Sequence, residues 1–429
     1  MGDHTGLSGL GSSRAVERRQ VHLGAPPALA AVVERARRRE SSRVGNGTGG
    51  IQAPPSPRVT VRVLHVVEAV EAEAARHVTD VVRHVPADHD VLVPPERAIG
   101  LTDVIALEAM EAAGARVHLT PMRRSVVDPR NVAAIRRVRR LIRRSQPDLV
   151  HGHASIGGAA ARLAASGTGV PRVYSPNGLM PGRAVHAAER LLGSLTDRFV
   201  AVSESEAELV ARRRIVPRER VAVIPNGIEL TPPGPPTLDL RARLQLRDDT
   251  PLVGSVGRLA AQKAPEVFVR ACARVASLQP EAHFVLVGDG PLRDVVNSEV
   301  EATGLDGRFA YLPGLRGAAT VMGQFDVFVL ASRYEGCPYA PLEAMRAGTP
   351  VVLTDVVGNR DTVVDGESGL VVAPDDPEAL AAAVNRLLGD RWLRRRLAAA
   401  GRERVAVRFD VRLMVDRLAV LYRSLGANT

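Results

Sequence analysis

Two carboxylates, Glu335 and Glu343, frame a short stretch in the second half of the 429-residue chain. A run typical of a buried strand, Phe325-Asp-Val-Phe-Val-Leu330, comes before them, and a helical run from Pro341 to Ala347 follows. Proline suits the first position of a helix, because the N–H that it lacks has no partner there. The sequence therefore predicts a strand, a loop that holds Glu335, and a helix with Glu343 in its first turn.

Two cations, Arg258 and Lys263, bracket a second loop in the run Val256-Gly-Arg-Leu-Ala-Ala-Gln-Lys-Ala264. An Arg fork and a compact Lys charge together can bind a diphosphate. Lys263 is the only lysine of the chain, so no Gly-Lys-Ser/Thr phosphate loop is present and a pyridoxal enzyme would have to use this residue. We expect Lys263 to be an exposed loop cation that contributes little to fold stability.

Helix starts attract anions, because their first N–H groups are free and carry partial positive charge. A phosphate alone would not need two acids beside such a helix, but a ligand with both phosphates and hydroxyls would. A nucleotide-sugar is a ligand of this kind.

The pattern from Glu335 to Met345, E-G-x-P-x-x-x-L-E-A-M, resembles the signature of retaining GT-B glycosyltransferases of glycosyltransferase family 4. The Arg258 loop is similar to that family's G-R-L-x-x-x-K-G, with Ala264 in place of the last glycine. The resemblance implies that Glu335 contacts the transferred sugar and Glu343 the ribose. It also implies a metal-independent reaction in which Arg258 and Lys263 stabilise the leaving diphosphate, so that Glu335, Arg258 and Lys263 are the catalytic candidates.

Two further stretches resemble donor-cleft motifs of the family, namely Phe284-Val-Leu-Val-Gly-Asp-Gly-Pro291 and Tyr311-Leu-Pro-Gly314. An ordinary glycine turn explains the first of them equally well. The full set of expected donor-binding residues is Gly257, Arg258, Lys263, Gly288, Gly290, Leu312, Gly314, Glu335, Gly336, Leu342 and Glu343.

The acceptor side departs from the family pattern. His153 in His151-Gly-His-Ala-Ser155 is the candidate for acceptor contact, with a structural histidine as the alternative, and Asn177 stands where the family has a histidine. Asparagine can hydrogen-bond a sugar hydroxyl but cannot titrate. Glu71 and Glu73 occupy the place of a Gly-Gly loop, where they would cap a helix start but repel a diphosphate.

These residues predict transfer of a sugar from a UDP- or GDP-linked donor to an acceptor hydroxyl with retention, in cell-surface polysaccharide, glycolipid or secondary-metabolite glycan synthesis. The acceptor would be a glycan, a glycolipid or a small molecule, with no cofactor and no nucleic acid. The alternatives are a GT-B epimerase or phosphorylase, and a non-catalytic nucleotide-sugar binder. The latter is motivated by Glu71, Glu73 and Asn177. Asp88-His89-Asp90 also matches the D-x-D of metal-dependent glycosyltransferases of another fold.

Strand-like runs alternate with helical runs, which predicts an α/β protein with doubly wound parallel sheets covered by helices. The family resemblance implies the GT-B fold, in which two Rossmann-like domains face each other across a cleft and a last helix crosses back to the first domain. We expect a basic, disordered tail (1–57), an acceptor-side domain (58–224), a Pro/Gly-rich linker (225–250), a nucleotide-sugar-binding domain (251–410) and a helix that crosses back (411–429). The expected strands are 61–67, 89–93, 115–118, 148–151, 172–174, 199–202, 221–224, 252–256, 283–287, 309–312, 327–330, 351–354 and 370–372.

The net charge is +10, apolar residues make up 45% of the chain, and two cysteines are present. No secretory signal, membrane span or disulfide framework is apparent, so we expect a cytoplasmic protein. Val132, Ile135, Val138 and Ile142 recur near helical spacing among six arginines. A basic amphipathic helix of this kind either packs on the core or lies on the anionic inner face of a membrane.

Overall fold

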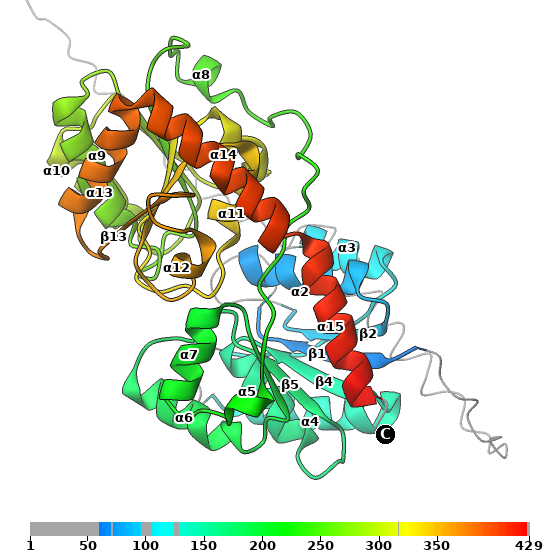
Figure 1. The fold of residues 1–429 in the computed structure, drawn as a ribbon. Coiled ribbons are helices and arrows are strands. Elements are labelled where there is room, and N and C mark those ends of the chain that lie inside the picture. Colours follow the sequence, from blue (N-terminus) through cyan, green and yellow to red (C-terminus); the bar gives the residue numbers. More distant parts are fainter. Residues whose placement is uncertain (1–59, 70–71, 96–103, 124–127, 316, 427–429) are drawn as a thin grey trace, which may run out of the picture. The chain divides into compact units, whose positions relative to one another are not determined.

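Figure 1 shows a computed structural model of the chain, which describes residues 60–69, 72–95, 104–123, 128–315 and 317–426. The expected basic tail (1–57) and Glu71 lie outside the described residues.

The first sheet has seven parallel strands in the order β3-β2-β1-β4-β5-β6-β7. Its central strands are rich in Val and Leu and almost fully buried, as expected for a parallel sheet covered on both faces. The strands are β1 (Arg62–Val67), β2 (Asp88–Val93), β3 (Arg116–Leu119), β4 (Leu149–His153), β5 (Arg172–Ser175), β6 (Arg198–Ala201) and β7 (Val221–Val223).

Side chains that alternate along β1 enter two separate cores. Val63 packs with the last helix, α15 (Val411–Gly426), whereas Leu64 and Val66 pack with α4 (Pro129–Ser145) and α5 (Ser155–Ala165). The helices therefore cover both faces of the sheet. The remaining helices of this half are α2 (Ala72–His84), α3 (Val104–Ala112), α6 (Arg183–Gly193), α7 (Glu204–Arg212) and the 3-10 turn η1 (Arg218–Arg220).

The second sheet has six parallel strands in the order β10-β9-β8-β11-β12-β13. Its strands are β8 (Leu252–Val256), β9 (His283–Val287), β10 (Phe309–Leu312), β11 (Val327–Leu330), β12 (Val351–Thr354) and β13 (Leu370–Val372). Its helices are α9 (Pro265–Leu278), α10 (Arg293–Thr303), η2 (Ala318–Thr320), η3 (Met322–Gln324), α11 (Tyr339–Ala347), α12 (Asn359–Thr362), α13 (Pro377–Gly389) and α14 (Arg391–Arg408).

Strand order reverses between β8 and β11, and ligands of doubly wound sheets bind at such a switch point, outside the carboxyl ends of the strands. The loop that follows β8 carries Arg258 and Lys263, and the loop that follows β11 carries Glu335. The topology thus brings together the two stretches that the sequence singled out.

The chain passes between the two sheets twice, and the two passages are hydrogen-bonded to each other. The Ile228 N–H donates to the carbonyl of Phe409 at 2.8 Å, and the Val411 N–H donates to the carbonyl of Ile228 at 3.0 Å. The linker also holds the short helix α8 (Leu240–Arg243). After the second passage, α15 packs against α2 and β4 (Figure 1), which confirms the expected crossover helix.

All thirteen expected strands are present with ends within two residues of the expected ones. One helix start was wrong: α11 begins at Tyr339, so Pro341 is its third residue and Glu343 lies beyond the first turn. Proline is tolerated there too, because the first four N–H groups of a helix have no partner within it.

The arginine-rich helix α4 packs on the core through Ala134, Val138 and Ile142. Its most buried apolar side chains are therefore covered by protein. Four of the six arginines after Val132 are exposed, namely Arg136, Arg140, Arg143 and Arg144. Among the described residues, no helix is both long and apolar enough to cross a bilayer.

Candidate functional site

Glu335 lies at the centre of the candidate site. Its carboxylate accepts hydrogen bonds from Ser332 Oγ at 2.6 Å and from Lys263 Nζ at 2.7 Å, and only 1% of the side chain is exposed. Burial raises the pKa of Glu335 above its ordinary value, and the Lys263 ammonium works against that rise. Gln262 Nε2 also donates to the Tyr334 carbonyl at 3.1 Å, which ties the β8 loop to the β11 loop.

Lys263 was expected to be exposed, and this expectation was wrong. Its side chain is 9% exposed, and its ammonium lies between Glu335 and, at 3.0 Å, Glu73 of helix α2. Burial alone would lower the pKa of Lys263, but the two carboxylates outweigh it and hold the pKa above its ordinary value. Glu73, which we expected to repel a diphosphate, is paired with this lysine. The cation needs these partners because an unpaired buried charge is costly.

Glu343 is paired with a second residue of α2. The guanidinium of Arg76 binds its carboxylate and lies over the Tyr339 ring, 4.5 Å from the ring centre. Glu73 and Arg76 are three residues apart and so share one side of the helix. Helix α2 therefore engages both acidic residues of the motif, Glu343 directly and Glu335 through Lys263.

Arg258 has no carboxylate partner among the described residues. Its Nη2 atom donates to Gln262 Oε1 at 3.3 Å, and the side chain is half-buried. The charge of Arg258 is therefore left for an incoming anion.

Close backbone approaches explain three of the expected glycines. A Cβ on Gly288, whose φ is +143°, would lie 1.9 Å from the Gly257 carbonyl oxygen, and one on Gly290 would lie 2.4 Å from that of Leu259. A Cβ on Gly336 would lie 2.5 Å from the Gly178 nitrogen. These contacts join the β8 and β9 loops and bring the Glu335 loop against the first half of the chain.

The other expected donor residues are less direct. The Leu312 carbonyl accepts the Gly288 N–H at 3.1 Å, and Gly314 lies in the exposed turn after β10 with a φ of +65°. Leu342 is fully buried in an apolar core cluster.

His153 ends a chain of buried histidines in which each ring contacts the next. Its Nε2 atom lies 3.0 Å from His65 Nδ1, His65 Nε2 lies 2.9 Å from His89 Nδ1, and His89 Nε2 lies 3.0 Å from the Val85 carbonyl. Burial lowers the pKa of all three rings, so they are neutral. Because a carbonyl only accepts, each ring donates toward Val85, and His153 Nδ1 is left with a lone pair. That nitrogen is buried and has no partner in the described structure.

A neighbouring histidine brings the nitrogens of three rings within 4.8 Å of one another, those of His65, His151 and His153. His151, however, uses both of its nitrogens in hydrogen bonds, to Tyr422 Oη at 2.7 Å and to Ser175 Oγ at 2.8 Å. Both nitrogens of His65 are engaged as well. The rings are therefore held by two sets of hydrogen bonds, one that joins β4, β1 and β2 and one that joins β4, β5 and α15.

Asn177 lies on the same loop as Gly178, with a φ of +55°, and both polar atoms of its amide are buried without a partner in the described structure. Glu206 holds this loop by accepting the N–H groups of Gly178 at 3.1 Å and of Leu179 at 2.8 Å. Burial raises the pKa of Glu206 to about 7. The loop thus presents an unsatisfied amide next to the backbone of Gly336.

The Asp88-His89-Asp90 match has a structural explanation. Asp90 is buried, forms a two-pronged ion pair with Arg116, and accepts a hydrogen bond from His118 at 2.8 Å. These partners hold its pKa below the ordinary value despite burial, which opposes them most strongly.

Sequence reasoning missed the parts played by Arg76, Ser332 and Glu206. The spacing of Glu73 and Arg76 on one side of a helix was the available signal for the first. Nothing in the sequence context distinguishes Ser332 from an ordinary loop serine, or Glu206 from a helix-start acid.

Comparison with known proteins covers both halves of the chain. Residues 74–231 match the family model described as Glycosyltransferase Family 4, and residues 237–404 match that of Glycosyl transferases group 1. The D-inositol 3-phosphate glycosyltransferase of Stackebrandtia nassauensis is 34% identical over 60% of this chain and 64% of its own length. The alpha-D-kanosaminyltransferase of Streptomyces kanamyceticus is 35% identical over 44% of this chain and 49% of its own length. This chain therefore spans less than two thirds of the length of either relative.

A longer match is the alpha-maltose-1-phosphate synthase of Mycolicibacterium smegmatis, which is 32% identical over 65% of this chain and 79% of its own. Among solved structures, an Anabaena protein in complex with UDP and glucose has a TM-score of 0.71 at 19% identity, covering 85% of this chain and 100% of that one. Sucrose-phosphate synthase from Thermosynechococcus elongatus has a TM-score of 0.71 at 22% identity, covering 86% and 100%. With both sheets, the crossover helix and both family models in agreement, the chain belongs to glycosyltransferase family 4 and has the GT-B fold.

Proposed function

We propose that this protein transfers a sugar from a UDP- or GDP-linked donor to an acceptor hydroxyl, with retention at the anomeric carbon. The observation that carries the proposal is the convergence of Glu335, Lys263 and Arg258 at the switch point of the second sheet, with Glu343 on the adjoining helix. Acids and cations held together in this way suit a ligand that carries both hydroxyls and a diphosphate.

The donor diphosphate would bind at Arg258 and Lys263, which stabilise the negative charge that grows on the leaving group. The Glu343 carboxylate would hold the ribose, and Glu335 would orient the transferred sugar. Two residues of helix α2 form ion pairs with these groups, Glu73 with Lys263 and Arg76 with Glu343. The donor would have to displace both α2 side chains in order to bind. The diphosphate would take the place of the Glu73 carboxylate at Lys263, and the ribose would take the place of the Arg76 guanidinium at Glu343.

On the acceptor side, Asn177 and His153 each offer a buried polar atom without a partner in the described structure. Such atoms are costly to bury and are satisfied when a hydroxyl reaches them. In this proposal the oxygen of the leaving phosphate accepts the proton of the acceptor hydroxyl as the new glycosidic bond forms and the bond to the phosphate breaks. Catalysis then depends on positioning and electrostatic stabilisation.

The acceptor class and the cellular place remain proposals. Relatives are named for transfer to D-inositol 3-phosphate and to 2-deoxystreptamine, and another is named for a diphosphoundecaprenol acceptor. We place this chain in glycan, glycolipid or secondary-metabolite synthesis in the cytoplasm. Contact with the inner face of the membrane would involve the arginines of α4.

A panel of nucleoside-diphosphate sugars, incubated with the purified protein and followed by mass spectrometry, tests the proposal. A transferase releases nucleoside diphosphate, slowly with water and faster with a suitable acceptor. Isomerisation of the donor sugar without nucleotide release would indicate an epimerase. Binding without any turnover across donors and acceptors would indicate a non-catalytic binder.

A further inference from the structure

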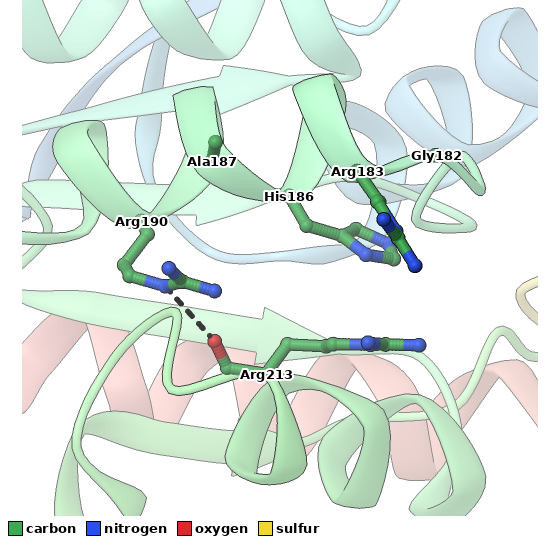
Figure 2. Close-up of a pocket in the computed structure, with 6 residues that line it drawn as sticks. All are labelled: Gly182, Arg183, His186, Ala187, Arg190 and Arg213. Carbon is green, nitrogen blue, oxygen red and sulfur yellow. Dashed lines mark hydrogen bonds between the residues drawn. The ribbon is translucent and has the colours of Figure 1, made fainter.

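A pocket of about 530 Å³ lies on the first half of the chain, and none of its lining residues is among the candidate site residues. It is formed by helix α6 and the end of α7, and its lining residues are Gly182, Arg183, His186, Ala187, Arg190 and Arg213. Figure 2 shows Arg183, His186 and Arg190 on α6 and Arg213 across from them.

The pocket carries three guanidinium groups and no carboxylate in its lining. None of Arg183, Arg190 and Arg213 forms an ion pair with a described residue, although Arg190 Nε donates to the Arg213 carbonyl at 3.2 Å. The neighbouring acids are engaged elsewhere: Glu189 binds the buried Arg162, and Glu208 binds Arg212. Three like charges that converge without a counterion repel one another, and an anion would relieve this repulsion.

His186 is a second, independent indication of a ligand. The residue is only 8% exposed, yet its Nε2 atom is buried and has no partner in the described structure. Burial lowers the pKa of His186, and Arg213 and Arg190 lower it further, whereas a hydrogen bond to the Met180 backbone and the Glu189 carboxylate oppose this shift. An anion between the ring and Arg213 would offset the effect of Arg213 on the pKa of His186. The ring could then take up a proton, and Nε2 could donate a hydrogen bond to the anion.

The first turn of α6 adds free donors at the same place. The helix has 11 residues, and its N-cap, Gly182, has no side chain that could bind the first N–H groups. Helix starts of this kind favour phosphate, and guanidinium groups bind phosphate oxygens in pairs.

We propose that this pocket binds a phosphate group, carried either by a soluble phosphomonoester or by a lipid headgroup. It is separate from the donor site, since none of its residues belongs to the β8, β9 or β11 loops. The proposal therefore stands whether or not the glycosyltransferase activity is confirmed.

Calorimetric titration of glycerol phosphate and of sulfate into the purified protein tests the pocket, with Arg213→Gln and Arg183→Gln as variants. Arg212→Gln is the matched control, because Arg212 is an exposed neighbour that pairs with Glu208 and does not line the pocket. We expect each pocket variant to weaken binding about tenfold, as the loss of one charge-assisted hydrogen bond does, and the control to bind like the parent. Anion binding at the donor site would persist equally in all four proteins.

Sulfate also tests His186, because the charge of sulfate is constant between about pH 6 and about pH 8, the range in which a histidine titrates. The parent should bind sulfate more tightly at the lower pH, since binding takes up a proton on His186, and His186→Gln should remove most of this dependence. Binding that is unchanged in both arginine variants, or equally weakened in the control, would overturn the proposal.

Vesicles that contain phosphatidic acid distinguish the two sources of the phosphate group. Co-sedimentation that Arg213→Gln abolishes and Arg212→Gln preserves identifies a lipid headgroup. Binding of glycerol phosphate without such co-sedimentation identifies a soluble phosphomonoester. If neither probe binds in a way that depends on Arg183 and Arg213, the pocket is not a phosphate site.

Discussion

Replacing Lys263 by methionine would remove the ammonium that neutralises Glu335 while keeping a side chain of similar length. Lys263 Nζ lies 2.7 Å from Glu335 Oε1, and the two side chains are 9% and 1% exposed, so solvent screens this pair only weakly. Glu73 is 41% exposed and adds little to the pair. Breaking a buried ion pair is costly chiefly because the remaining charge has no partner.

Protonation of Glu335 limits the size of this loss. A carboxyl with an ordinary pKa of 4.5 costs about 1.4 kcal/mol per pH unit to keep neutral, which amounts to about 3 kcal/mol at about pH 7. We therefore expect Lys263→Met to lower the free energy of unfolding by about 3 kcal/mol at neutral pH. The loss should shrink as the pH falls toward 4.5, because the folded state then keeps its proton on Glu335 without cost.

Urea denaturation followed by circular dichroism at neutral and mildly acidic pH measures this loss. Arg258→Met is the matched control, since Arg258 lies in the same loop without a carboxylate partner in the described part of the chain. The double variant Lys263→Met/Glu335→Gln should recover most of the stability. A loss below about 0.5 kcal/mol at neutral pH, the size of an ordinary surface substitution, would refute the reasoning.

Four further predictions concern the site and its surroundings. Glu343→Ala should weaken the binding of donor and of free nucleotide equally, by about 1.5–3 kcal/mol. Glu335→Ala should raise the activation free energy of turnover by about the same amount and change nucleotide affinity less. Calorimetry measures the binding, and steady-state rates measure the turnover. Glu73→Gln should tighten nucleoside diphosphate binding several-fold, because it removes the carboxylate that competes for Lys263; weaker binding would mean that Glu73 supports the site. Burial raises the pKa of Glu206 from 4.5 to about 7, so the stability contributed by its protonated form should be lost as the pH rises between these values; Glu206→Gln should flatten that part of the pH profile of the melting temperature. The parent protein should sediment with anionic vesicles more than with neutral ones if α4 contacts the membrane, and equal, negligible sedimentation with both would exclude that contact.

The strands could be predicted from the sequence because each is a short run of β-branched and apolar residues between glycine, proline or polar breaks. Helix α11 could be predicted too, but not its first residue, since proline is tolerated throughout the first turn. Local pattern is sufficient for such elements because the forces that select them act over a few residues.

The environment of Lys263 could not be predicted in the same way. Its partners Glu335 and Glu73 are 72 and 190 residues away, and the second comes from the other sheet's half of the chain. Residue types at Lys263 and Glu335 suggest a chemistry, but the burial and pairing of the two side chains depend on how the halves of the chain meet. The histidine chain that ends at His153 is hidden for the same reason, since its members come from three strands that only the sheet order brings together.

A product time course tests whether the protein transfers a sugar with retention at the site of Glu335 and Lys263. The donor selected from the panel is incubated with its acceptor, and nucleoside diphosphate and the anomeric configuration of the product are followed together by NMR. The account predicts one nucleoside diphosphate released per sugar transferred, a product with the donor's anomeric configuration, and loss of most turnover in Glu335→Gln. An inverted product, or full turnover in Glu335→Gln, would contradict it.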